Sequence, residues 1–118
     1  MLFRSVIILA LLPNVINELK NQLAAVFNKK QVIISVAAGI SLAKLQEIFS
    51  NSLITRVMPN TACQFNQSMT MIVQEGNNIA NEQAEAIFKL LGTTVILEEI
   101  KIHVFIAICG SAIAYPYY

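Results

Sequence analysis

The sequence is poor in metal ligands and in cysteine. Its 118 residues contain no tryptophan, one histidine and two cysteines. Cys63 and Cys109 lie far apart and form no Cys-x-x-Cys pair. One imidazole and two separated thiols are too few ligands for a zinc site and indicate no disulfide framework. We therefore predict no metal site and two reduced thiols in a cytoplasmic protein.

Charged residues are also few, and they are mixed in sign. Eight Lys+Arg and seven Asp+Glu give a formal net charge of +1. No block of like charge occurs, so the sequence does not predict binding to nucleic acid or to an anionic membrane surface.

Long apolar runs are absent as well. The N-terminal run behind Arg4 is far shorter than the roughly 20 residues that a membrane-spanning helix needs. No small-x-small cleavage site follows this run. A short secretory leader, which would make this a small secreted protein, stays as an alternative interpretation of the first dozen residues.

Apolar residues make up 56% of the chain without counting glycine, whereas about 45–50% is usual with glycine included. A domain of this length buries only about two-thirds of the surface that its unfolded chain exposes. Some apolar surface should therefore face outward unless another subunit or another stretch of chain covers it. The sequence is typical of one domain at most, and it reads as part of a larger protein or assembly.

Short apolar runs alternate with segments of helical spacing. The predicted strands are residues 5–11, 32–37, 53–58, 69–73 and 93–97. The predicted helices are 13–27 starting at Pro13, 42–49 capped by Ser41, 81–91 capped by Asn81 and ended by Gly92, and 98–115 interrupted or bent at Gly110. This rhythm predicts a doubly wound α/β fold, with a mainly parallel sheet covered on both faces and right-handed crossovers.

In such sheets, ligands bind outside the carboxyl ends of the strands. Three predicted junctions lie there, at residues 10–13, 36–39 and 58–61. Small residues at the second junction allow a phosphate or ribose to approach the backbone closely. Pro59, Asn60 and Thr61 are also typical of a plain turn, but their position at this edge favours a ligand contact.

The glycines that a complete dinucleotide site needs are missing. Four glycines are scattered along the chain, and no G-x-G-x-x-G or Walker-type loop is present. The sequence therefore predicts the second half of a nucleotide-binding fold, without the half that holds the pyrophosphate.

Five segments occur in an order and at a spacing that resemble the pyrroline-5-carboxylate reductases: SVIILALLPNVINEL, VIISVAAGISLAKL, ITRVMPNTACQFNQSMTM, AEAIFKLLGTTVILEEIKIH and GSAIAY. The resemblance implies hydride transfer from NADH or NADPH to 1-pyrroline-5-carboxylate, which gives L-proline in proline biosynthesis. It also implies a Rossmann domain followed by a helical dimerisation domain. Residues 1–98 would be the latter part of the first domain, and residues 99–118 the start of the helix that leads to the second.

The same resemblance assigns cofactor contacts but no catalytic residue. The implied contacts are Ala10, Leu11, Leu12, Pro13, Val36, Ala37, Ala38, Met58, Pro59, Asn60 and Thr61. The chain departs from the family pattern at Leu12, where the family has lysine, at Ala62 and Ile113, where it has proline, and at Ser68, where it has glycine. These departures fall on turn or contact positions, as expected if the pressure to keep a cofactor site has gone.

The isolated chain is therefore predicted to bind NAD or NADP weakly or not at all and to be inactive. Glu98 and Glu99 are acid/base candidates, but carboxylates are also favourable at a helix start. His103 is interpreted as an ordinary histidine, one that packs against its neighbours or whose ring tip points toward solvent, and not as a catalytic residue. The alternative to a reductase fragment is a non-catalytic remnant that packs its apolar surface onto a partner, such as the remainder of the enzyme or a second copy of the chain.

Overall fold

A computed structural model describes residues 5–26, 31–59 and 68–112 of the chain. The strands are β1 (Val6–Leu9), β2 (Val32–Ser35), β3 (Leu53–Met58), β4 (Ser68–Val73) and β5 (Gly92–Leu97). The α-helices are α1 (Pro13–Val26), α2 (Leu42–Ile48), α3 (Asn78–Phe88) and α4 (Ile102–Ala112). Two short 3-10 helices precede β5 and α4, namely η2 (Lys89–Leu91) and η3 (Glu99–Lys101).

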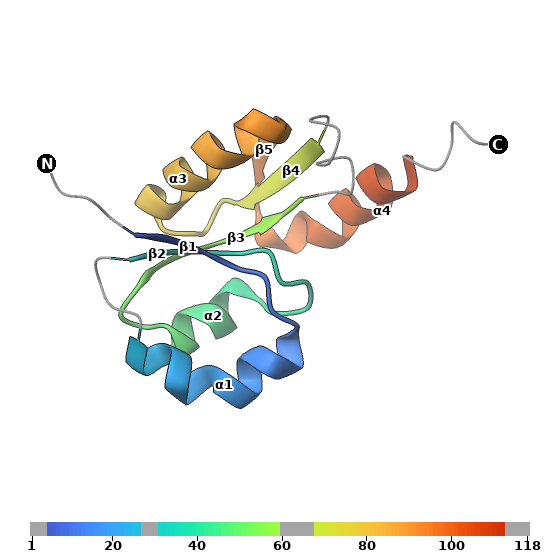
Figure 1. The fold of residues 1–118 in the computed structure, drawn as a ribbon. Coiled ribbons are helices and arrows are strands. Elements are labelled where there is room, and N and C mark those ends of the chain that lie inside the picture. The colour runs from blue at the N-terminus through green and yellow to red at the C-terminus, as the bar shows by residue number, and fades with distance from the viewer. Residues whose placement is uncertain (1–4, 27–30, 60–67, 113–118) are drawn as a thin grey trace, which may run out of the picture.

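The strands form one sheet in the order β1-β2-β3-β4-β5. All neighbouring pairs are parallel except β3 and β4, which are antiparallel. Helices α1 and α2 cover one face and α3 covers the other (Figure 1). This confirms the predicted α/β class. The antiparallel pair has a simple cause, because residues 59–67 are too few for the crossover of a dozen or more residues that a parallel pair needs.

The core consists of two layers, one on each face of the sheet. Strand β2 is buried at every position, and its side chains alternate between the two layers as the pleat requires. Ile33 belongs to the layer that also contains Ile16 of α1, Leu45 of α2, Phe49 just after α2, and Ile102 and Phe105 of α4. Val32 and Ile34 pack with α3 through Ala80, Ala84 and Phe88.

Helix α3 begins earlier than predicted, and Asn81 is not its cap. The Asn77 side chain accepts hydrogen bonds from the N–H groups of Ile79 and Ala80, at 2.9 and 3.2 Å, so Asn77 is the N-cap. Asn81 lies one turn further on and is buried. Its side-chain oxygen accepts a hydrogen bond from the Thr55 hydroxyl. Its side-chain nitrogen donates one to the carbonyl of Val73, the last residue of β4. The prediction was wrong because two asparagines of similar local context compete, and only tertiary contacts distinguish them.

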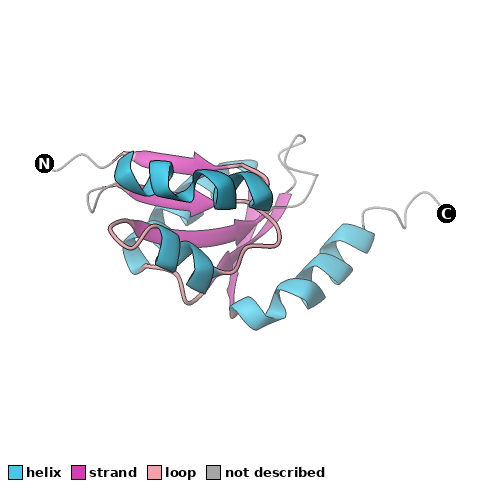
Figure 2. Cartoon of the chain, turned by 90° about the horizontal axis from the view of Figure 1, so that it is seen from below, coloured by secondary structure: helices cyan, strands magenta, loops and turns pink. Residues whose placement is uncertain are grey.

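The last helical segment also differs from the prediction. Glu98 precedes η3, and α4 starts only at Ile102. Gly110 lies inside α4 and does not interrupt it. The predicted residues 113–115 lie outside the described part. Figure 2 shows α4 extending away from the sheet.

Val6–Leu9, within the apolar run that could also be a secretory leader, form β1, which pairs with β2. Among the described helices, none is both long and apolar enough to cross a bilayer.

Candidate functional site

The first three strands end at the same edge of the sheet, where β3 extends two residues beyond the ends of β1 and β2. Leu9 is paired with Ser35, and Ser35 is paired with Arg56. The three strands are parallel, so the segments that follow them leave from the same edge. Strands β1 and β2 each end two residues earlier than predicted, so residues 10–11 and 36–37 already belong to these loops.

Two of the three predicted contact segments touch each other at this edge. The N–H of Val36 donates a hydrogen bond to the carbonyl of Leu9 at 3.1 Å. Gly39 has a φ of 85°, which favours glycine, and a Cβ added there would lie 3.5 Å from Cγ of Pro13. The loops after β1 and β2 therefore form a continuous surface in the described part of the chain.

The predicted contact residues differ in their accessibility. Ala10, Leu11, Leu12 and Ala38 are exposed, with Leu12 at 67%. Pro13, Val36, Met58 and Pro59 are half-buried. Ala37 is buried, and its N–H donates to Oγ of Ser35 at 3.3 Å. Asn60 and Thr61 lie outside the described residues.

A cavity of about 810 Å³ opens between this edge and the start of the C-terminal helical segment. Its lining residues are Ala38, Gly39, Ser41, Arg56, Met58, Glu75, Glu99, Ile100, Ile102, His103 and Ile106. The volume is in the range of sites that bind small molecules or cofactors. The cavity therefore joins two predicted contact loops to η3 and α4.

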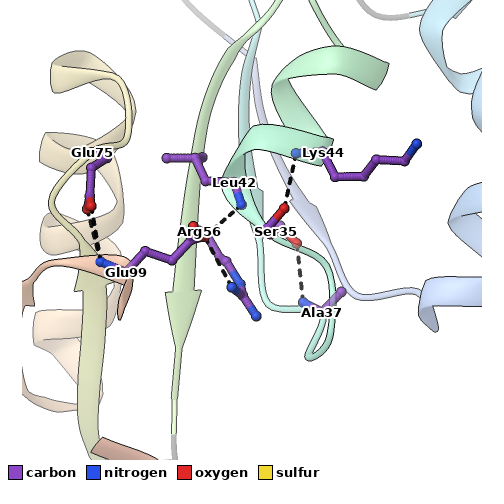
Figure 3. A network of polar contacts seen from close by, with 8 residues as sticks. Ser35, Ala37, Leu42, Lys44, Arg56, Glu75 and Glu99 are labelled. Carbon is purple, nitrogen blue, oxygen red and sulfur yellow. Dashed lines mark hydrogen bonds and ion pairs between the residues drawn. The ribbon is translucent and has the colours of Figure 1, made fainter. Parts of the chain in front are cut away.

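A network of polar contacts lines this cavity (Figure 3). Arg56 on β3 is 7% exposed, and its Nη1 lies 3.1 Å from Oε2 of Glu99. The same carboxylate oxygen accepts a hydrogen bond from the N–H of Leu42 at 2.6 Å. The N–H of Glu99 in turn donates to both carboxylate oxygens of Glu75, at 3.0 and 3.3 Å.

This network was not predicted from the sequence, in which Glu98 and Glu99 are both interpreted as carboxylates at a helix start. In the structure, only Glu98 stays at the surface, where it pairs with Lys101 at 3.6 Å. A signal was present in the sequence, because an arginine within a buried strand requires a carboxylate partner, and Arg56 lies in such a strand.

The charges around the cavity restrict what it can bind. One arginine faces two glutamates there, which leaves an excess of one negative charge among these three side chains. That excess disfavours a pyrophosphate, whereas the walls formed by Met58 and Ile106 suit a flat ring with polar substituents. The described residues contain no group of three side chains able to hold a metal ion.

These features define an α/β domain of the nucleotide-binding type, with a cavity at the carboxyl edge of its parallel strands. No model of a known protein family matches the sequence. Curated proteins do match it. Pyrroline-5-carboxylate reductase 3 of Danio rerio is 31% identical over 116 residues, which cover 94% of this chain and 40% of that protein. The Synechocystis reductase is 33% identical over 114 residues, which cover 93% and 42%.

Solved structures give the same result. A pyrroline-5-carboxylate reductase from Coxiella burnetii has a TM-score of 0.74 and 28% identity, covering 95% of this chain and 43% of that one. The Plasmodium falciparum enzyme with NADP bound has a TM-score of 0.76 at 24% identity, which shows the fold alone, and covers 93% and 44%.

The chain is therefore similar over most of its length to part of the pyrroline-5-carboxylate reductases, and the resemblance predicted from its five segments is confirmed. It spans only about 40% of the length of the curated relatives that it matches.

Proposed function

We propose that this chain forms the nicotinamide side of the dinucleotide site in a pyrroline-5-carboxylate reductase. The complete enzyme would transfer a hydride from NADH or NADPH to 1-pyrroline-5-carboxylate and form L-proline. One observation carries the proposal. The loops after β1 and β2 and the end of β3 meet at one edge, beside a cavity of about 810 Å³. Relatives that bear this enzyme's name support it.

The chain alone is proposed to be inactive. Hydride transfer requires the nicotinamide ring to be held against the imine carbon in near-attack geometry. The 118 residues contain no Gly-rich turn for the pyrophosphate, and they match only about 40% of a relative. Activity would need the segments that the relatives have in addition. The complete enzyme is proposed to be cytoplasmic and homo-oligomeric.

A graft into the Escherichia coli relative tests the proposal. That reductase is 27% identical to the chain over 115 residues, which cover 95% of the chain. The matched stretch of that reductase is replaced by this chain, and the graft is produced in a strain lacking its own reductase. Oxidation of NADPH by the graft is followed with 1-pyrroline-5-carboxylate as substrate, and growth of the strain is followed without proline. We expect the graft to oxidise NADPH and to restore growth without proline, and the isolated chain to do neither.

Two matched variants test whether NADPH binds the graft at the cavity edge. Ala38→Phe places a large ring in the loop at the cavity edge, whereas Ala25→Phe places the same ring on the exposed surface of α1. Only the first should weaken NADPH binding. A folded graft that binds no NADPH, or equal effects of both variants, would contradict the proposal. Turnover by the isolated chain would contradict its proposed inactivity.

A non-catalytic role is the second candidate, and one observation favours it. Ile100, Val104 and Ile106 are 82%, 59% and 42% exposed along η3 and α4. An exposed apolar surface of this kind is typical of a contact with another protein segment. If the graft is folded but binds no dinucleotide, and the chain forms a stable complex with the remaining parts of the reductase, this candidate is supported instead.

A further inference from the structure

One residue, through its side chain and its backbone, connects four separate parts of the fold. Glu99 begins η3, and its Oε2 accepts hydrogen bonds from Arg56 on β3 and from the N–H of Leu42 at the start of α2. Its backbone N–H is bound by Glu75 in the turn before α3. The partners Glu75, Arg56 and Leu42 are 24, 43 and 57 residues away in the sequence.

These partners lie next to the proposed cofactor loops. Leu42 directly follows the loop after β2, which contains Ala38 and Gly39. Arg56 lies two residues before Met58 on β3. On the other side, Glu99 leads through η3 into α4, which supplies His103 and Ile106 to the far wall of the cavity. Glu99 thus bridges the two sides between which the cavity opens.

The contacts of the Glu99 side chain are partly shielded from water and directional. The Arg56 side chain is 8% exposed and that of Glu99 is 26% exposed. Both hydrogen bonds of Leu42 and Arg56 end on one oxygen atom, so a movement of η3 would disturb them together. The apolar contacts of Ile102 and Phe105 also hold α4 against the sheet, but such packing has no preferred direction.

We propose that Glu99 is a positioning residue that sets the separation of α4 from the loop after β2. In this way it would hold the cavity at the width that the nicotinamide half of the cofactor requires. This role rests on the proposed function, since Glu99 acts through Arg56 and Leu42 and is assigned no contact with the reacting atoms.

A distance measurement tests the positioning without any cofactor. Spin labels are placed at Gln46→Cys on α2 and Val104→Cys on α4, two exposed positions, with Cys63 and Cys109 replaced by serine. Glu99→Ala removes the oxygen that accepts both hydrogen bonds and should broaden the distance distribution. Glu99→Gln keeps a carbonyl oxygen that can accept both hydrogen bonds and should restore most of its sharpness. The control Glu98→Ala removes only the surface pair with Lys101 and should leave the distribution unchanged.

Equal distributions for Glu99→Ala and the unsubstituted chain would overturn the proposal, as would broadening in Glu98→Ala of the same size. If Glu99→Ala does not fold, Arg56→Gln answers the same question from the other partner. It should broaden the distribution while Lys101→Gln does not. A sharp distribution in folded Arg56→Gln would then count against the proposal.

NADPH binding by the graft gives a second readout. A misplacement of about 1 Å can cost about 100-fold in reaction rate, and we expect Glu99→Ala to weaken NADPH binding by about tenfold. Glu99→Gln should recover most of this loss, and Glu98→Ala should bind like the parent. If no graft binds NADPH, the proposed function fails, but the distance distributions still decide whether Glu99 positions α4.

Discussion

Replacement of Asn81 by alanine should destabilise the fold far more than its location on a helix suggests. Asn81 is 9% exposed. Its amide nitrogen donates to the carbonyls of Val73 at 3.2 Å and Gly76 at 3.4 Å, and its carbonyl oxygen accepts from the hydroxyl of Thr55, which is 0% exposed. The Asn81 side chain thus joins α3 to β3 and to the end of β4.

The expected loss can be estimated from these contacts. Alanine would leave the buried Thr55 hydroxyl without its acceptor, at about 1–3 kcal/mol. It would also remove the hydrogen bonds to the carbonyls of Val73 and Gly76, at about 0.5–1.5 kcal/mol each, although the Val73 carbonyl still accepts from the N–H of Gly76 at 3.1 Å. The better helix propensity of alanine returns about 0.5 kcal/mol. We expect a net loss of about 2–4 kcal/mol in the free energy of unfolding. For a chain of this length, that lowers the melting temperature by roughly 6–16 °C.

Urea and thermal unfolding followed by circular dichroism measure this loss. Asn78→Ala is the matched control, because Asn78 is exposed at the first residue of α3. It should change stability by less than about 0.5 kcal/mol. A loss for Asn81→Ala as small as that of Asn78→Ala would refute the reasoning. A double-mutant cycle with Thr55→Val should show a coupling of about 1 kcal/mol between the two side chains.

Two further predictions concern the cavity edge and the exposed apolar surface. Leu12→Lys, at a position that is 67% exposed, should tighten NADPH binding by the graft about fivefold. A cation near the nucleotide is worth about 1 kcal/mol, and Leu12→Gln should give no such gain in a fluorescence titration. Ile100→Asp combined with Val104→Asp should reduce concentration-dependent self-association of the isolated chain in sedimentation velocity. Persistent association in this variant would show that the surface of η3 and α4 is not its cause.

Much of the fold could be predicted from local pattern. Strand β3 (Leu53–Met58) has its predicted bounds, and α1 starts at Pro13 as predicted. Ser41 caps α2 as predicted, with its Oγ accepting from the N–H of Lys44 at 3.2 Å. These features depend on residues adjacent in sequence, whose propensities and hydrogen bonds are local.

The parts that could not be predicted depend on contacts between distant residues. Asn77 and Asn81 are both plausible caps, and only the burial of Asn81 against Thr55 decides between them. The distinction between Glu98 and Glu99 has the same origin, because Arg56 is 43 residues away from Glu99. A local pattern contains no information about such pairs, so the sequence predicted the edge of the site but not the network behind it.

The most direct test of the account is a map of where the nicotinamide side of the cofactor lies. The grafted reductase is labelled with an NADP analogue that carries a photoreactive group on its nicotinamide ring, and the labelled peptides are identified by mass spectrometry. The account predicts labelling within residues 10–13, 36–39 and 58–61. Labelling confined to α3 or to β5, away from the edge where β1, β2 and β3 end, would contradict it.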